Sequence, residues 1–182
     1  MSAADSRVNE VSRAFVTEAR RLLTDEYLPK IERCLEKLSD DEIWWRPNAE
    51  SNSVGNLLLH VAGNARQWVV SGLGGEADIR VRDAEFDERS PIPRAELLLR
   101  LRQTVREVDS VLVDFNDREI LAQRKIQGTN VSALQAIFHV TEHFSMHTGQ
   151  IILLTKMLAR KDLGFYDFST GVPVHSWRKR KS

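Results

Sequence analysis

Apolar residues recur every three or four positions along most of the chain, the spacing that places them on one face of an α-helix. This pattern predicts four helices, over residues 6–38, 53–71, 94–115 and 131–158. Pro29 lies inside the first of them and predicts a kink or a break just before it. A pattern of period two, which would indicate a strand, never persists for more than a few residues.

The segments between these helices are rich in turn formers. Ser39 and Glu42 have the spacing of a capping box and predict a short helical turn that Pro47 ends. Residues 72–92 are rich in glycine, proline and charge, and we expect them to form an irregular excursion. The connection to the fourth helix contains Gly128.

Four amphipathic helices with no sheet to pack on predict an all-α fold, an up-down four-helix bundle. We expect Ser53 or Asn52 to cap the second helix and Asn130 to cap the fourth. The bundle should occupy residues 1–160. Residues 161–182 carry aromatic residues and turn formers, and should form a C-terminal tail that packs on the bundle.

The charge balance bears on which partners the chain can have. The charges of the 26 basic and 26 acidic residues cancel, so the formal net charge is zero. Proteins that bind phosphate backbones carry a surplus of basic residues, so we do not expect nucleic acid to be a partner. A basic run at residues 178–181 is expected to be a solvated end. No apolar segment approaches the ~20 residues that span a bilayer.

The single cysteine, Cys34, cannot form an intrachain disulfide, and its amphipathic surroundings favour a buried thiol over a reactive one. The N-terminal residues contain no apolar core of signal-peptide length. Both features favour a cytoplasmic protein.

Histidines carry the candidate chemistry. His139, His143 and His147 follow one another at four-residue steps, so each step turns only about 40° around the helix and all three point to nearly one side. Neighbours in this series lie about 6 Å apart along the axis, which allows two of them to share a metal ion. The series spans about 12 Å, too far for one ion to bind all three.

A third ligand must come from another helix. His60 is the only other histidine in a predicted helix, and it lies on an apolar face that should turn inward. Three imidazoles from two helices would leave coordination positions open for water or substrate. Alternatively, buried histidines could hydrogen-bond to carbonyl groups of the bundle, and exposed ones could face water.

Two segments resemble the DinB/YfiT-like family. SNSVGNLLLHVAGNARQW is similar to the second helix of that family, and HVTEHFSMHTGQI to its fourth. The resemblance covers residues 6–160 and implies an up-down-down-up four-helix bundle, often dimeric, that holds a divalent metal through three histidines. Matched by position, these are His60, His143 and His147. His139 then falls outside the triad, as a residue that supports a ligand, lines a pocket or has a structural role.

Four other residues near the histidines have alternative interpretations. Gln150 and Asn64 could hydrogen-bond to a ligand or substrate, or could be ordinary polar positions in helix packing. Gly149 favours close approach of another helix, and Glu142 favours an ion pair over metal ligation. Five aromatic residues could line a pocket, although such residues more often form core; they are Trp44, Trp45, Trp68, Phe138 and Phe144.

These observations lead to two classes of function. The first is a metal-dependent hydrolase or thiol transferase that uses a metal-activated water or thiol, with a small-molecule substrate or thiol cosubstrate. The second is a non-catalytic metal-binding or dimerising helical bundle. Three imidazoles suit Zn, Ni, Fe or Co about equally, and no catalytic residue can be assigned from the sequence.

Overall fold

The computed structural model describes residues 3–177. Seven α-helices lie in this part of the chain: α1 (Ala3–Arg21), α2 (Leu28–Leu35), α3 (Asp40–Trp44), α4 (Val54–Ala65), α5 (Arg82–Asp87), α6 (Arg94–Val113) and α7 (Ala133–Ala159). Two π-helical segments, η1 (Leu22–Tyr27) and η2 (Arg66–Ser71), extend α1 and α4, and a 3-10 turn, η3, covers Asp117–Glu119. Two hairpins complete the fold: β1 (Gln123–Ile126) with β2 (Thr129–Ser132), and β3 (Tyr166–Asp167) with β4 (Val174–His175).

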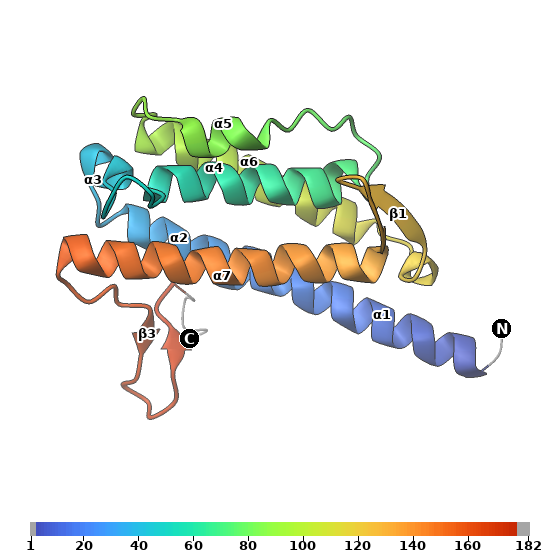
Figure 1. The fold of residues 1–182 in the computed structure, drawn as a ribbon. Helices are drawn as coiled ribbons and strands as arrows, with labels where there is room; N and C mark the ends of the chain where they lie inside the picture. The colour runs from blue at the N-terminus through green and yellow to red at the C-terminus, as the bar shows by residue number, and fades with distance from the viewer. Residues whose placement is uncertain (1–2, 178–182) are drawn as a thin grey trace.

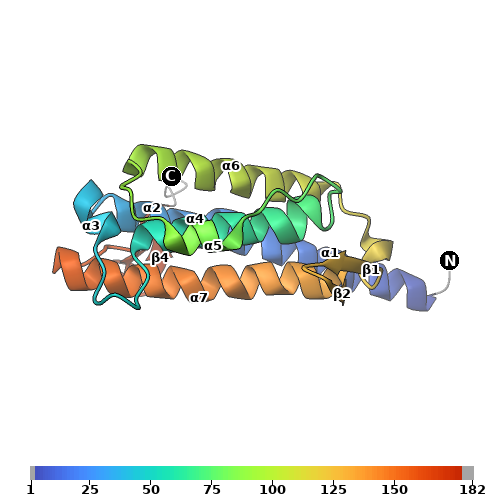
Figure 2. The same cartoon turned by 45° about the horizontal axis from the view of Figure 1, so that its top comes forward.

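The four long helical rods form the up-down-down-up bundle that was expected. The α1–η1–α2 rod and α7 run in one direction, and α4 and α6 run in the other (Figures 1 and 2). The long segment after η2 returns along the outside of α4, carries α5 there, and so allows α4 and α6 to be parallel. No helix of the described residues is long and apolar enough to cross a membrane.

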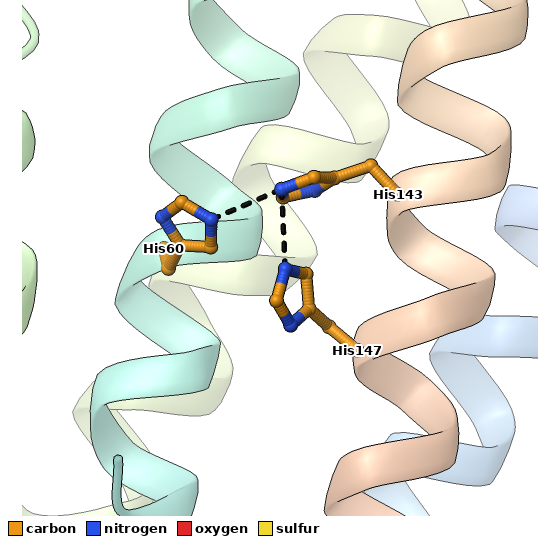
Figure 3. A group of neighbouring side chains, drawn as sticks. All are labelled: His60, His143 and His147. Atoms are coloured by element: carbon orange, nitrogen blue, oxygen red, sulfur yellow. Dashed lines mark hydrogen bonds between the residues drawn. The ribbon is translucent and has the colours of Figure 1, made fainter. Parts of the chain in front are cut away.

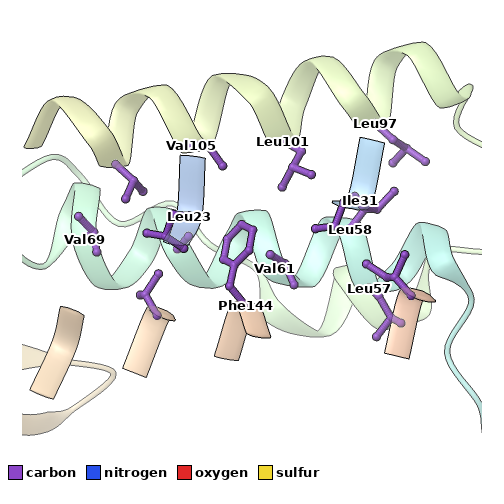
Figure 4. Close-up of a cluster of buried hydrophobic side chains, with 14 of the residues drawn as sticks. Leu23, Ile31, Leu57, Leu58, Val61, Val69, Leu97, Leu101, Val105 and Phe144 are labelled. Atoms are coloured by element: carbon purple, nitrogen blue, oxygen red, sulfur yellow. The ribbon is translucent and has the colours of Figure 1, made fainter. Parts of the chain in front are cut away.

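All four rods contribute to one apolar core (Figure 4). Leu23 and Ile31 enter it from the first rod, and Phe144 enters it from α7. The remaining labelled residues come from α4, η2 and α6, namely Leu57, Leu58, Val61, Val69, Leu97, Leu101 and Val105. The three- and four-residue spacing of these residues is what turns one stripe of each helix inward.

The first rod does not break at Pro29. The chain stays helical throughout, and the irregularity before the proline is the π-helical segment η1 rather than a break. Pro29 falls in the first turn of α2, where its missing N–H is least costly, and η1 absorbs the change in hydrogen bonding just before it.

The N-termini of three helices are closed by capping boxes. Ser39 caps α3 and Ser53 caps α4, both as expected. The prediction for the fourth helix was wrong, because Ser132 rather than Asn130 caps α7, with Gln135 as its reciprocal partner. Asn130 instead pairs with Lys125 in the β1–β2 hairpin, which the sequence pattern had not indicated.

The C-terminal segment folds back as the β3–β4 hairpin. His175 Nε2 lies 3.0 Å from Glu26 Oε2, and the Trp177 indole donates to the backbone oxygen of Asp25 at 3.2 Å. The hairpin is therefore attached to the first rod at η1. The basic run expected to be a solvated end falls in residues 178–182, outside the described residues.

Candidate metal centre

His60 is positioned by the N-terminal part of α4. Ser53 accepts a hydrogen bond from the backbone N–H of Asn56, which starts the helix, and the following apolar residues turn its inner face toward the core. His60 occupies that face and is buried. The sequence therefore places an imidazole inside the bundle through the same periodicity that builds the core.

His143 and His147 lie one turn apart on the inner side of α7. Figure 3 shows both rings reaching from α7 toward the ring of His60 on α4. His143 Nε2 lies 3.0 Å from His60 Nε2 and 3.2 Å from His147 Nε2. The three histidines offer ring nitrogens that all lie within 4.8 Å of one another, so the structure brings together the residues that the sequence selected.

A buried carboxylate orients the ring of His60. Glu85 Oε2 lies 2.9 Å from His60 Nδ1, and Glu85 is held by Arg80 through hydrogen bonds of 2.7 and 2.8 Å. An ionised carboxylate can only accept, so this shorter contact assigns the proton of His60 to Nδ1 and leaves the Nε2 lone pair facing the other two rings. Arg80 Nη2 also lies 3.2 Å from His60 Nδ1, but its shorter hydrogen bond is the one that it donates to Glu85 Oε2.

Gln150 does the same for His147. Its Oε1 atom lies 2.7 Å from His147 Nδ1, and an amide oxygen is an acceptor, so Nδ1 carries the proton. The ligand-supporting interpretation of Gln150 therefore agrees with the geometry. His143 Nδ1 is buried and has no hydrogen-bond partner among the described residues.

This donor set fits a cation. Two lone pairs, on His60 Nε2 and His147 Nε2, face His143 Nε2, and a single proton on His143 could satisfy only one of them. Nitrogens that bind one ion at about 2.1 Å lie about 3.4 Å apart in tetrahedral geometry, close to the separations observed from His143. Three neutral imidazoles in this arrangement could hold a divalent metal ion.

Burial favours the neutral form of the two triad rings on α7, His143 and His147. Burial, reinforced by the nearby His147 and His60, lowers the pKa of His143 to about 3. Burial also lowers the pKa of His147, although its hydrogen bond to Gln150 opposes the shift. Burial alone would raise the pKa of Glu85, but the hydrogen bonds from Arg80 and His60 outweigh it and lower that pKa. Ionised Glu85 and neutral imidazoles are the states that metal ligation requires.

His139 lies beside the triad but outside it. Its ring centroid is 5.3 Å from that of His143 and 4.1 Å from that of Trp68, and Asn64 Nδ2 lies 3.2 Å from its Nε2. Asn64 therefore supports His139 rather than a member of the triad. Glu142 Oε1 lies 3.4 Å from His139 Nδ1, so Glu142 contacts the histidine outside the triad and ligates no member of the triad. Burial lowers the pKa of His139, so this contact joins a carboxylate to a neutral imidazole and is not the expected ion pair.

Two functional residues escaped the sequence analysis. Arg80 and Glu85 lie in the segment that had been expected to be only an irregular excursion. Asn56 attaches this segment to α4, because its side-chain amide donates to the backbone oxygens of Glu85 at 2.8 Å and Glu88 at 3.2 Å. Neither Arg80 nor Glu85 lies in a periodic or motif-like stretch of sequence, so only the fold reveals that both reach His60.

Gly149 and the five aromatic residues do not all have the roles that the sequence suggested. Among residues 3–177 nothing approaches Gly149, because a Cβ atom there would meet no described atom within 4 Å. Phe144 is core, Trp44 packs on Gly55, and Trp68 packs against His139 with the two rings tilted. Trp45 and Phe138 are exposed, so the five aromatic residues do not line one common pocket.

Comparison with known proteins agrees with this architecture. A crystal structure of a DinB-like protein from Bacillus cereus ATCC 10987 superposes with a TM-score of 0.56 at 15% sequence identity, covering 72% of this chain and 85% of that one. At this identity the likeness shows the fold. No curated protein matches the sequence. The family model described as "Protein of unknown function (DUF1572)" matches residues 10–171. The chain thus belongs to the DUF1572 family and has the DinB-like fold.

Proposed function

We propose that this protein binds one divalent metal ion through His60, His143 and His147, and uses it as a hydrolase or thiol transferase. The convergence of three Nε2 atoms, with separations of 3.0 and 3.2 Å from His143, is the observation that carries the proposal. Zn, Ni, Fe and Co all accept imidazole ligands, and the ligand set does not choose among them.

The ligand count favours chemistry over a closed structural site. Among the described residues, no cysteine, carboxylate or fourth histidine joins the triad, whereas structural zinc sites have four protein ligands. If bound by these three histidines, a divalent ion would supply Lewis-acid chemistry and would bring the pKa of a water ligand toward ~7. The substrate class that follows is a small molecule attacked by water or by a low-molecular-weight thiol.

The residues around the triad prepare it for this role. Glu85 and Gln150 fix two of the imidazoles in the tautomer that ligates through Nε2, and Arg80 keeps Glu85 ionised. His139 and Trp68 form a half-buried wall on the N-terminal side of His143 along α7, where a substrate group could lie. No residue is assigned a catalytic role.

A second candidate is a non-catalytic ion that stabilises the bundle. It is favoured by burial, since His60, His143 and His147 are only 6, 7 and 8% exposed. A structural ion would be inaccessible to small anions, and its removal would lower the melting temperature sharply. An accessible ion would instead change its spectrum when azide or thiocyanate is added to the cobalt-substituted protein.

Metal content tests the proposal directly. Untagged protein, purified without chelator, should contain about one divalent ion per chain by inductively coupled plasma mass spectrometry. His60→Ala and His143→Ala should lose the ion. His139→Ala is the matched control, because this histidine lies on the same helix but outside the triad, and it should retain the ion. Metal-free wild type that takes up no added Zn, Ni, Fe or Co would contradict the proposal.

Activity is the second test. The metal-loaded protein should turn over a member of an ester, amide, epoxide or thiol-acceptor panel, and His143→Ala should not. Metal-loaded protein that is inert on all four panels, with an ion that anions cannot reach, would favour the structural role. We further propose that the protein is cytoplasmic and has no nucleic-acid partner, which is supported by the balanced charge and the single buried cysteine. The resemblance to the DinB/YfiT-like family, which is often dimeric, supports the proposal of a homodimer.

A further inference from the structure

A groove lies beside Gln150, which follows the triad along α7. It has a volume of about 310 Å³, and α4, α7 and the connection between α3 and α4 all contribute to its walls. Figure 2 shows that connection extending to the C-terminal half of α7. Gln150 belongs both to this groove and to the candidate metal centre, because its Oε1 atom lies 2.7 Å from His147 Nδ1. A single side chain therefore separates the groove from the ring of a proposed metal ligand.

The end of the groove farther from the triad is apolar. Leu57 of α4 lines it, together with Leu153 and Leu154 of α7. Leu153 is 60% exposed, so the described part of the chain leaves most of this side chain uncovered. Leu153 follows His147 by six positions on α7, which is about 9 Å along the helix axis. A small molecule whose apolar group covers Leu153 would therefore reach the edge of the triad.

Two side-chain amides in the groove have hydrogen-bonding groups that the protein does not use. The Gln150 amide contacts His147 through Oε1, and its Nε2 atom donates to no group among residues 3–177. The side chain of Asn52, on the α3–α4 connection, has no hydrogen-bond partner in the same range. A ligand carbonyl would accept from Gln150 Nε2, and a ligand N–H would donate to Asn52 Oδ1. A carboxamide carries both of these groups.

The charges in the groove favour a neutral ligand over an anion. Glu50 lines the groove, and its carboxylate forms no ion pair with any residue that the structure describes. None of the described residues that line the groove is a lysine, an arginine or a histidine. A carboxylate ligand would be repelled by Glu50 and would meet no counter-charge. An uncharged carboxamide forms the same hydrogen bonds without this repulsion.

We propose that this groove binds the apolar, carboxamide-bearing part of the small-molecule substrate, and that Gln150 links the bound substrate to the metal centre. The inference rests on the proposed function, which supplies the ion beside the groove. Small-molecule sites have volumes of about 300–1,000 Å³, so a groove of about 310 Å³ suits one carboxamide with a side chain the size of leucine. The rest of the substrate would extend past Gln150 toward His147.

Gln150 makes the two sites interdependent. When its Nε2 atom donates to a ligand carbonyl, the amide is polarised, and Oε1 becomes a stronger acceptor for the His147 Nδ1–H group. A stronger hydrogen bond at Nδ1 raises the basicity of the ring nitrogen that would bind the metal. A ligand in the groove should therefore tighten metal binding. By thermodynamic reciprocity, the metal should tighten binding of that ligand by the same factor.

Isothermal titration of the metal-free protein tests the groove. N-acetyl-leucinamide is the probe and should bind at millimolar concentration, whereas N-acetyl-leucine, which ends in a carboxylate, should bind about tenfold or more weakly. Leu153→Asp should weaken binding of the probe about tenfold or more, because it removes the apolar wall. Leu134→Asp is the matched control, because Leu134 is 38% exposed at the other end of α7, and it should bind as the wild type does. An absence of binding, or binding that Leu153→Asp leaves unchanged, would overturn the proposal.

The same titration of the zinc-loaded protein tests the link through Gln150. Affinity for the probe should rise about fivefold, at the lower end of typical couplings between sites. Asn52→Ala should weaken binding equally in both forms, because Asn52 does not contact His147. Equal affinities of the two wild-type forms would overturn the link. Protein that binds zinc but not the probe would overturn the groove alone, whereas protein that binds the probe but no divalent ion would contradict the proposed metal-dependent function.

Discussion

Gly63 and Glu85 lie so close together that a Cβ atom at Gly63 would be 1.9 Å from Glu85 Oε1. The glycine on α4 therefore makes room for the carboxylate that orients His60 one turn earlier on the same helix. Arg80 occupies the same space, with its Nε atom 3.2 Å from the same Cβ position. Gly63, which has no side chain of its own, thus allows the α5 segment to reach the histidine triad.

Replacement of Gly63 by alanine should weaken metal binding. The new methyl group displaces Glu85, and the loss of a hydrogen bond to a ligand histidine commonly lowers metal affinity by about 10- to 100-fold. Isothermal titration of the metal-free protein with Zn²⁺ measures the effect.

A double-mutant cycle provides the control. Gly63→Ala in a Glu85→Ala background should change affinity far less than it does alone, because the methyl group then has no carboxylate to displace. Equal effects in both backgrounds would show that Gly63 acts independently of Glu85.

Glu85→Gln should destabilise the protein. The Arg80 side chain is 4% exposed, so the change leaves a buried guanidinium without its counter-charge, at a cost of about 3 kcal/mol. Urea denaturation measures the free energy of unfolding. The exposed pair of Glu96 and Arg100 provides the comparison, and Glu96→Gln should cost less than about 1 kcal/mol. Similar losses for both variants would contradict the buried ion pair.

The metal-free protein should lose stability as the pH falls below about 6.5. His143 has a pKa of about 3 when folded, against about 6.5 when unfolded, so the unfolded state binds the extra proton between these values. Stability is then complete above the unfolded pKa, and it falls by up to about 1.4 kcal/mol per pH unit for this one group. Denaturation between pH 7 and 5 measures the slope.

The variant His143→Leu should show a shallower slope over the same range. Glu85 does not interfere there, because its lowered pKa confines its titration to a pH below the range tested. A slope unchanged by the substitution would exclude His143 as its source.

Cys34 should be inert in the folded protein. Burial raises the pKa of its thiol to about 11, and the side chain is fully enclosed by the core. Iodoacetamide at pH 8 should modify it only after denaturation, as followed by intact mass. Rapid modification of the native protein would show that the first rod opens near η1 and α2.

The fold was predictable where each rod repeats a simple rule. Leu97, Leu101 and Val105 recur at helical spacing and are buried. Ser39 and Ser53 each cap the N-terminus of a helix through reciprocal hydrogen bonds with the residue three positions later. Interactions of this kind join residues within about one turn, so they are legible in the order of the amino acids. The β1–β2 hairpin was missed because its strands are short and their register depends on Gln127 and Gly128, which adopt positive φ.

By itself the sequence determined a helical bundle with inward-facing histidines, and His143 and His147 share one side of α7 because four residues make nearly one turn. Only the tertiary structure decided that His60 meets them, and that Glu85 and Arg80 stand behind it. In the sequence, His143 lies 83 positions from His60, Glu85 lies 25 positions from it, and Arg80 lies 20 positions from it. Their contacts therefore depend on how the rods pack and on where an aperiodic segment is attached. Local periodicity encodes the direction of a side chain, whereas the packing of distant segments decides what it meets.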